Sequence, residues 1–155
     1  MAKIIYIGSD HGGFKLKKKL VTFLEKENYL VEDMGPLKLN SKDDYPDYAS
    51  KVAKKVTHET NSRGILLCRN GQGVCIAANK IKGIRAVTGF SQKMIKSTRL
   101  DDNANVLCLP ADYITEKEAK RIVSTFLKTK YSQLKRHKRR LMKVALDKTE
   151  VLRRR

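Results

Sequence analysis

The 155-residue sequence has no tryptophan, only three prolines and three cysteines, and an aromatic content of 6%. The cysteines, Cys68, Cys75 and Cys108, form an odd set without a C-x-x-C pair. This pattern matches neither a zinc site nor the cysteine framework of a disulfide-stabilised secreted domain. We therefore expect reduced thiols and no cysteine-bound zinc.

Long apolar segments are also missing, since no stretch approaches the roughly 20 apolar residues that span a bilayer. The first residues, MAKIIYIGSDHGG, hold only a short apolar run. We expect a cytoplasmic protein with no membrane partner. Hydrophobic residues still make up 41% of the chain, and its length suits one domain with a sizeable core. The prediction is a single domain over residues 1–155.

Acidic residues are scarce, because 16 Asp and Glu stand against 34 Lys and Arg, giving a formal net charge of +18. Such a charge attracts anions, and nucleic acid is one class of partner to weigh. The lysines recur in KLKKKL, KVAKKV and QKMIK, stretches typical of exposed helix faces, with no aromatic residues between them. A solvated surface is therefore the favoured interpretation, and nucleic-acid binding is the alternative.

Short apolar runs alternate with segments of helical periodicity along the chain. The predicted strands cover residues 3–9, 29–35, 63–68, 83–89 and 105–110, and the predicted helices cover 14–28, 47–59, about 74–81, 91–100 and 116–130. Thr115 and Glu118 have the spacing of a capping box at the start of the last of these helices. The basic segment from Lys135 to Arg155 is expected to form a terminal helix with a frayed end.

Strands that alternate with helices pair in parallel through right-handed crossovers. The predicted fold is therefore α/β, a three-layer sandwich with a five-stranded parallel sheet and a C-terminal helix. Because such sheets bind ligands at the carboxyl ends of their strands, we expect three segments to meet at one edge. They are SDHGG after the first strand, CRNGQG after the third, and the loop around Asp101 before the fifth.

Cys68 ends a buried strand and precedes a loop that contains Gly71 and Gly73. Backbone amides of a glycine loop that enters a helix make an anion site, suited to a phosphate or to the oxyanion of an enediolate. A thiol beside such amides and next to Arg69 is suited to act as a base, whereas a buried cysteine is usually inert. The pattern alone leaves both interpretations open.

Asp10 and His11 stand side by side where the first strand ends. A carboxylate and an imidazole at a sheet edge can exchange protons with sugar hydroxyls or bind a phosphate. The alternative is that Asp10 only caps the helix that follows. Arg136 and Arg140 lie one helical turn apart in KRHKRRLMK, and two guanidinium groups at that spacing can bind a phosphate or remain solvated.

In these residues the chain resembles the ribose-5-phosphate isomerase B family, which includes the subunits of galactose-6-phosphate isomerase. The matching motifs occur in order over nearly the whole chain: GSDHGGFKLK, DYPDYA, GILLCRNGQGVCIAANKIKGIRAV, DDNANVL and KRHKRRL. The resemblance implies a Rossmann-like homodimer, or a tetramer built from it, with active sites between subunits and no cofactor. The implied reaction interconverts an aldose phosphate and a ketose phosphate, with ribose 5-phosphate the favoured substrate.

The resemblance also implies a role for each matching residue. Cys68 would be the base, because Val74 stands where other members have a glutamate. The amides around Gly71 and Gly73 would stabilise the enediolate, supported by Asn70. The remaining implied roles are ring opening by Asp10, and substrate or phosphate binding by His11, Tyr45, Arg136 and Arg140. At two positions that do not match the family, our own expectation is that Asp101 donates a proton in ring opening and that Arg69 binds the phosphate.

Three positions depart from the family pattern. Arg69 replaces a glycine, Asp101 replaces the ring-opening histidine, and Asp112 replaces a phosphate-binding arginine. Our hypothesis is that Arg69 supplies the positive charge that is lost at Asp112. The departures also favour an alternative function, a sugar-phosphate-binding protein with little or no activity.

Overall fold

The computed structural model describes residues 4–145 of the chain. Five strands form one sheet in the order β2-β1-β3-β5-β4, and every neighbouring pair is parallel. The strands are β1 (Ile4–Ser9), β2 (Leu30–Asp33), β3 (Arg63–Cys68), β4 (Ala86–Thr88) and β5 (Val106–Pro110). The predicted five-stranded parallel sheet is confirmed.

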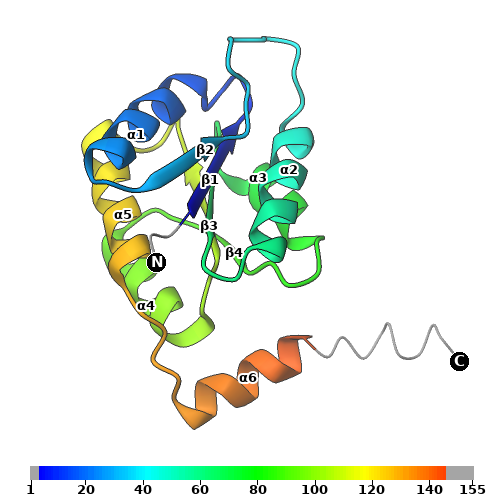
Figure 1. Ribbon diagram of the computed structural model, residues 1–155, viewed down its shortest axis with the longest axis vertical. Coiled ribbons are helices and arrows are strands. Elements are labelled where there is room, and N and C mark those ends of the chain that lie inside the picture. The colour runs from blue at the N-terminus through cyan, green and yellow to red at the C-terminus, as the bar shows by residue number, and fades with distance from the viewer. Residues whose placement is uncertain (1–3, 146–155) are drawn as a thin grey trace, which may run out of the picture.

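Helices cover both faces of this sheet (Figure 1). The helices are α1 (Phe14–Lys26), α2 (Tyr45–His58), α3 (Gln72–Asn79), α4 (Gln92–Asp102), α5 (Glu116–Lys128) and α6 (Lys135–Ala145). Helices α1, α4 and α5 pack on one face, and α2 and α3 on the other. The three-layer sandwich is thus confirmed, and none of the described helices is long and apolar enough to cross a bilayer.

The central strand β3 shows how the sequence makes the two cores. Its residues from Gly64 to Cys68 are all buried, and successive side chains point to opposite faces. Ile65 and Leu67 join the core under α1, α4 and α5, whereas Leu66 and Cys68 join the core under α2 and α3. The Cys68 side chain therefore faces α2 and α3 at the carboxyl end of its strand.

The strand order predicts a ligand-binding crevice at that same end. Strand β1 is followed by β2 on one side and β3 is followed by β4 on the other, so the connections that leave β1 and β3 run in opposite directions across the sheet. Parallel sheets bind ligands at the carboxyl ends of strands where the direction of winding changes. Here Asp10 follows β1 and Cys68 ends β3, which places both beside the crevice.

Helix α6 lies at the opposite end of the molecule. Figure 1 shows it below the sandwich, beyond the amino ends of the strands and apart from the helical layers. Its inner residue, His137, is buried, and its other side chains are largely exposed. The predicted terminal helix is confirmed from Lys135 to Ala145, and the rest of the predicted basic tail, 146–155, lies outside the described residues.

The predicted elements differ from the observed ones mainly at their ends. The capping box is present: the Thr115 hydroxyl accepts from the Glu118 amide at 3.2 Å, and the Glu118 carboxylate accepts from the Thr115 amide at 2.7 Å. Helix α3 begins at Gln72 rather than near Val74, because the left-handed Gly71 turns the chain directly into the helix.

Candidate active site

The turn from β3 into α3 brings the Cys68 thiol next to a polar side chain. The Cys68 Sγ atom lies 3.7 Å from Asn70 Oδ1, and the same amide oxygen accepts from the Gln72 backbone N–H at 3.0 Å. The Asn70 side chain therefore accepts a hydrogen bond from the first amide of α3 and also contacts the thiol. The next amides of that first turn have no partner within the helix, and they make an anion site beside the thiol.

Two glycines give this turn its shape. Gly71 has a φ of +70°, and a Cβ atom there would lie 2.9 Å from the backbone nitrogen of Pro110. A Cβ atom on Gly73 would lie 2.7 Å from the ring of Tyr45, the first residue of α2. Tyr45 therefore lies directly against the turn.

The loop after β1 meets this turn. A Cβ atom on Gly12 would lie 2.5 Å from Arg69 Cγ and 3.3 Å from the Arg69 nitrogen, so the two loops are in contact. Asp10 is buried, and its Oδ1 atom accepts from the Gly13 N–H at 3.2 Å. Asp10 is therefore not the N-cap residue of α1, which is Gly13; its carboxylate instead holds the turn that leads into the helix, at the carboxyl edge with Cys68.

His11 is held by a residue that the sequence did not single out. Asp43 Oδ1 accepts from the His11 backbone N–H at 3.0 Å and lies 2.7 Å from His11 Nδ1. Asp43 belongs to the polar loop between β2 and α2, which Figure 1 shows rising above the carboxyl edge of the sheet. The position of Asp43 in the sequence could have indicated this contact. Its loop follows the strand β2, and a loop that follows a parallel strand begins at the same edge as the other ligand-binding loops.

Two of the positions that depart from the family pattern contact each other. The Arg69 Nη1 atom lies 3.5 Å from Asp112 Oδ2, and both side chains are exposed. Beneath this pair, the Asp112 N–H donates to the Arg69 carbonyl oxygen at 2.9 Å. The Asp112 carboxylate is therefore paired with the Arg69 guanidinium, the cation that this chain has in place of the family's glycine.

Asp101 is not where the sequence predicted it. We expected it on a loop at the carboxyl edge, but it lies in the last turn of α4, near the amino end of β5. That expectation was wrong because a residue that precedes a parallel strand lies at the amino end of the strand. Asp101 Oδ1 is 3.6 Å from Nε2 of the buried His137, and the same nitrogen accepts from Arg136 Nε at 3.1 Å.

The sequence-predicted residues thus fall into two groups. Cys68, Asp10, His11, Tyr45 and the loop with Arg69, Asn70, Gly71 and Gly73 gather at the carboxyl edge, whereas Asp101, Arg136 and Arg140 gather around α6 at the amino edge. Within one chain the sheet separates the two groups (Figure 1). His137, which connects Asp101 to Arg136, is a second residue that the sequence analysis missed.

The other two thiols lie on the same face of the sheet as Cys68, Cys75 in α3 and Cys108 on β5. The Cys108 thiol donates to Cys75, and this lowers the pKa of Cys75 to about 7 against the opposing effect of burial, with a further contribution from the Thr88 hydroxyl. Burial raises the pKa of Cys108 well above its ordinary value. Within residues 4–145, no group of three or more His, Cys, Asp or Glu side chains is placed to bind a metal ion.

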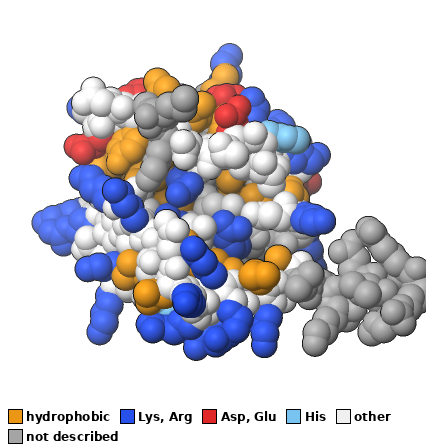
Figure 2. Space-filling model, turned by 60° about the horizontal axis from the view of Figure 1, so that its bottom comes forward, with side chains coloured by type: hydrophobic (Ala, Val, Ile, Leu, Met, Phe, Trp, Pro, Cys, Tyr) orange, Lys and Arg blue, Asp and Glu red, His pale blue; other side chains and the backbone are white. Residues whose placement is uncertain are grey.

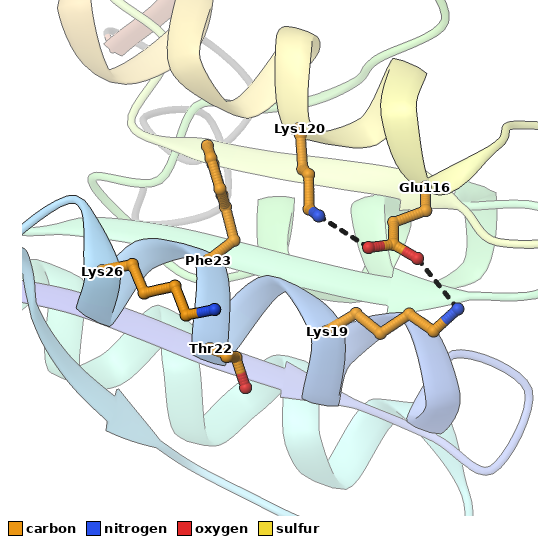
Figure 3. Close-up of a pocket in the computed structure, with 6 residues that line it drawn as sticks. All are labelled: Lys19, Thr22, Phe23, Lys26, Glu116 and Lys120. Carbon is orange, nitrogen blue, oxygen red and sulfur yellow. Dashed lines mark hydrogen bonds and ion pairs between the residues drawn. The ribbon is translucent and has the colours of Figure 1, made fainter.

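A separate depression lies on the other face of the sheet, between α1 and α5. Figure 3 shows its lining side chains, with Glu116 between the ammonium groups of Lys19 and Lys120 at 2.9 and 2.6 Å. Hydrogen bonds from Lys120 and then Lys19 lower the pKa of Glu116 to about 2. The cavity holds about 270 Å³, its one carboxylate is already paired with two lysines, and none of its lining residues belongs to the group around Cys68.

Comparison with known proteins agrees with this geometry. The family model described as Ribose/Galactose Isomerase matches residues 5–144. A probable ribose-5-phosphate isomerase B from Mycoplasma genitalium is 44% identical over 141 residues, which cover 90% of this chain and 92% of that protein. A ribose-5-phosphate isomerase B from Mycolicibacterium paratuberculosis is 34% identical, with coverage of 88% and 86%.

Solved structures show the same fold. The crystal structure of ribose-5-phosphate isomerase B from M. genitalium with bound ribulose-5-phosphate has a TM-score of 0.91 and 42% identity, and the match covers 97% of this chain and 99% of that one. The enzyme from Clostridium thermocellum has a TM-score of 0.90 and 38% identity, with coverage of 96% and 99%. The chain therefore belongs to the ribose/galactose isomerase family.

Proposed function

We propose that this protein interconverts ribose 5-phosphate and ribulose 5-phosphate, with Cys68 as the base. Family membership makes it a sugar-phosphate isomerase, which is an intramolecular oxidoreductase. The observation that carries the finer proposal is the Cys68 thiol at the carboxyl end of β3, beside Asn70 and the first amides of α3. A relative of 42% identity and the same fold has ribulose-5-phosphate bound.

The chemistry is a proton transfer between neighbouring carbons of the open-chain sugar. The Cys68 thiolate removes the proton from C2, and the electron pair moves toward the C1 carbonyl oxygen, which gives an enediolate. The amides around Gly71 and Gly73 stabilise the charge that develops on oxygen, and Asn70 holds their turn in place. The C2 hydroxyl proton passes to the C1 oxygen, and return of the carbon-bound proton to C1 gives the ketose, so no external oxidant, reductant or cofactor takes part.

The other residues at the carboxyl edge divide the remaining tasks. Asp10 lies next to the crevice and assists opening of the sugar ring. His11 and Arg69 provide positive charge or N–H donors for the phosphate, and the ring of Tyr45 closes one side of the pocket. Asp112 contacts Arg69, so the acidic group is directed at a cation and its repulsion of the phosphate is reduced.

A complete site requires a second copy of the chain. Arg136 and Arg140 are the phosphate-binding pair, with Asp101 beside them, and within one chain they lie across the sheet from Cys68. A homodimer in which α6 of one protomer reaches the Cys68 crevice of its partner brings the two groups together. A space of about 720 Å³ between α6 and the segment before β4, lined by Ile81, Ile84, Leu141 and Val144 among others, offers room for that partner.

The test is a direct assay with ribose 5-phosphate, in which exchange of the C2 proton and formation of ketose are followed. We expect turnover by the wild-type protein and a loss of at least about a hundredfold in Cys68→Ala. Turnover that survives this substitution would overturn the assignment of the base. Activity on another pentose or hexose phosphate but not on ribose 5-phosphate would overturn the substrate.

Two other functions are outcomes of the same experiment. Saturable binding of a sugar phosphate without proton exchange would identify a non-catalytic binding protein, the alternative that the changes at Arg69, Asp101 and Asp112 favour. Nucleic-acid binding rests on the net charge of +18 and would appear as affinity that falls steeply with salt. Figure 2 shows Lys and Arg side chains spread over the face that includes the amino edge, with hydrophobic and neutral groups between them.

A further inference from the structure

One carboxylate oxygen holds both the backbone and the ring of His11. Asp43 Oδ1 accepts from the His11 N–H at 3.0 Å and lies 2.7 Å from Nδ1. The two residues are 32 positions apart and come from different loops at the carboxyl edge. A short contact between a nearly buried carboxylate and an imidazole is an arrangement that fixes the orientation of the ring.

Asp43 is ionised in this setting. Burial raises the pKa of its carboxyl group, but hydrogen bonds from the His11 ring, the His11 backbone and Tyr48 outweigh that effect and lower it below its ordinary value. The same carboxylate, together with burial, raises the pKa of Tyr48. An ionised carboxylate can only accept hydrogen bonds, so His11 Nδ1 carries a proton and donates it.

The two side chains differ in their exposure to solvent. The Asp43 side chain is 5% exposed, whereas that of His11 is 29% exposed. With Nδ1 bound to the buried carboxylate, Nε2 is the ring nitrogen left to meet a ligand. When Nε2 also carries a proton, the ring is a cation that donates to an anion on one side, and the negative charge of Asp43 balances it on the other.

We propose that Asp43 is a positioning residue, which holds His11 so that its Nε2–H meets the phosphate of the substrate and which balances the charge of the ring. The proposal rests on the proposed isomerase function. The proposed role is more than anchoring one loop to the other. An asparagine at position 43 could accept from the His11 backbone N–H equally well, so anchoring alone would not require a carboxylate. Only the charged carboxylate enforces the donor role of Nδ1.

The test separates charge from shape. Asp43→Asn keeps an acceptor oxygen for the His11 backbone and removes the negative charge. Asp44→Asn removes the same charge from the neighbouring residue, whose exposed side chain makes no capping hydrogen bond to α2, so it is the matched control. We expect Asp43→Asn to raise KM for ribose 5-phosphate about tenfold, with a much smaller change in kcat, and Asp44→Asn to leave both unchanged.

A spectroscopic measurement reports on His11 directly. The chain has three histidines, so the ring nitrogens of His11 can be assigned by nitrogen-15 NMR with the help of a His11→Gln variant. In wild-type protein saturated with ribose 5-phosphate, Nδ1 is expected to carry a proton, because it faces the Asp43 carboxylate. In Asp43→Asn, the population with a protonated Nδ1 is expected to fall severalfold, because a neutral amide does not require Nδ1 to donate.

The outcomes distinguish this proposal from the proposed function. Equal KM values and equal His11 spectra in wild-type protein and Asp43→Asn, with an active wild-type enzyme, would overturn the role of Asp43 and leave the isomerase assignment intact. A wild-type protein without isomerase activity would overturn the proposed function itself. A parallel fall in kcat and stability with unchanged His11 spectra would identify a structural residue and would also overturn the proposal.

Discussion

At the scale of single residues, Cys75 is expected to be more reactive than an ordinary thiol. Its pKa of about 7 means that it is largely protonated below this pH and largely thiolate above it, and the thiolate is the reactive form. In a Cys68→Ala background only Cys75 and Cys108 remain. We expect iodoacetamide to alkylate one thiol, with a rate that rises with pH and reaches half its maximum near pH 7.

The fully buried Cys108 provides the control for this measurement. Because burial raises its pKa and removes it from solvent, the variant that combines Cys68→Ala with Cys75→Ser should remain unlabelled while the protein is folded. Mass spectrometry counts the added groups. Labelling of Cys108 at a rate similar to that of Cys75 would contradict this account of the pair.

The contact between Arg69 and Asp112 leads to a prediction about substrate affinity. Arg69→Met keeps the apolar stem over Gly12 and removes the charge, so we expect KM for ribose 5-phosphate to rise about fivefold, as for a loss of about 1 kcal/mol. Asp112→Asn should lower KM, because it releases Arg69 and removes a negative charge. Steady-state kinetics of both variants and of the double variant measure the effect.

Salt provides the check on this prediction, since exposed charges are screened. The differences in KM should shrink as ionic strength rises, and thermal unfolding should be almost unchanged because an exposed ion pair contributes little to stability. If Arg69→Met binds the substrate as tightly as the wild type at low salt, the hypothesis that Arg69 compensates for Asp112 is wrong.

Residue-level features differed in how far they could be predicted from the sequence. Asp10, His11 and Cys68 stand next to strand ends, so the local pattern was enough to place them at one edge. The contact of Asp43 with His11 joins two loops 32 positions apart, and no local pattern determines which of the acidic residues in the second loop makes it. The approach of Arg69 to Asp112 depends in the same way on how two loops pack.

At the scale of secondary-structure elements, the turn between β3 and α3 requires glycine at position 71. Its φ of +70° costs an L-residue about 1 kcal/mol or more, and a Cβ atom would press on the backbone of Leu109 and Pro110 at 3.0 and 2.9 Å. We expect Gly71→Ala to lower the free energy of unfolding by about 3 kcal/mol and to abolish activity by displacing the amides.

Gly83 supplies the control for that prediction. It also has a positive φ, +87°, but a Cβ atom there meets nothing closer than Thr57 Cγ2 at 3.7 Å. Gly83→Ala should therefore lose only the conformational cost, about 1 kcal/mol, and should retain activity. Denaturant unfolding and the isomerase assay compare the two, and equal losses of stability would show that the contacts at Gly71 are not the cause.

Elements were predictable where one physical signal dominates. The alternation of apolar runs with helical periodicity gave all five strands and their helices, and the capping box at Thr115 marked the start of α5 correctly. The motif DDNANVL placed Asp101 at the wrong edge of the sheet. The residue precedes β5 and so lies at the amino end of that strand. The edge that a residue reaches depends on whether it precedes or follows a strand, which a motif match alone does not take into account.

At the scale of the whole molecule, the parallel sheet separates two sets of polar residues. Cys68 and Asp10 lie at its carboxyl edge, and Arg136 and Arg140 lie on α6 beyond its amino edge. No hinge within the sheet could bring them together without breaking the strand pairing. The separation therefore follows from the fold. In the proposed homodimer, two-fold symmetry would bring each half of the site to its complement at two places.

A mixing experiment tests this arrangement. Cys68→Ala and Arg140→Ala damage opposite halves of the site, so each variant alone should be inactive. Co-refolding equal amounts gives mixed dimers in which one of the two sites is intact, and random pairing should restore about a quarter of the wild-type activity. Cys68→Ala mixed with Asp10→Ala, which damages the same half, should restore none. Recovery in neither mixture, although mixed dimers form, would place the complete site within one chain.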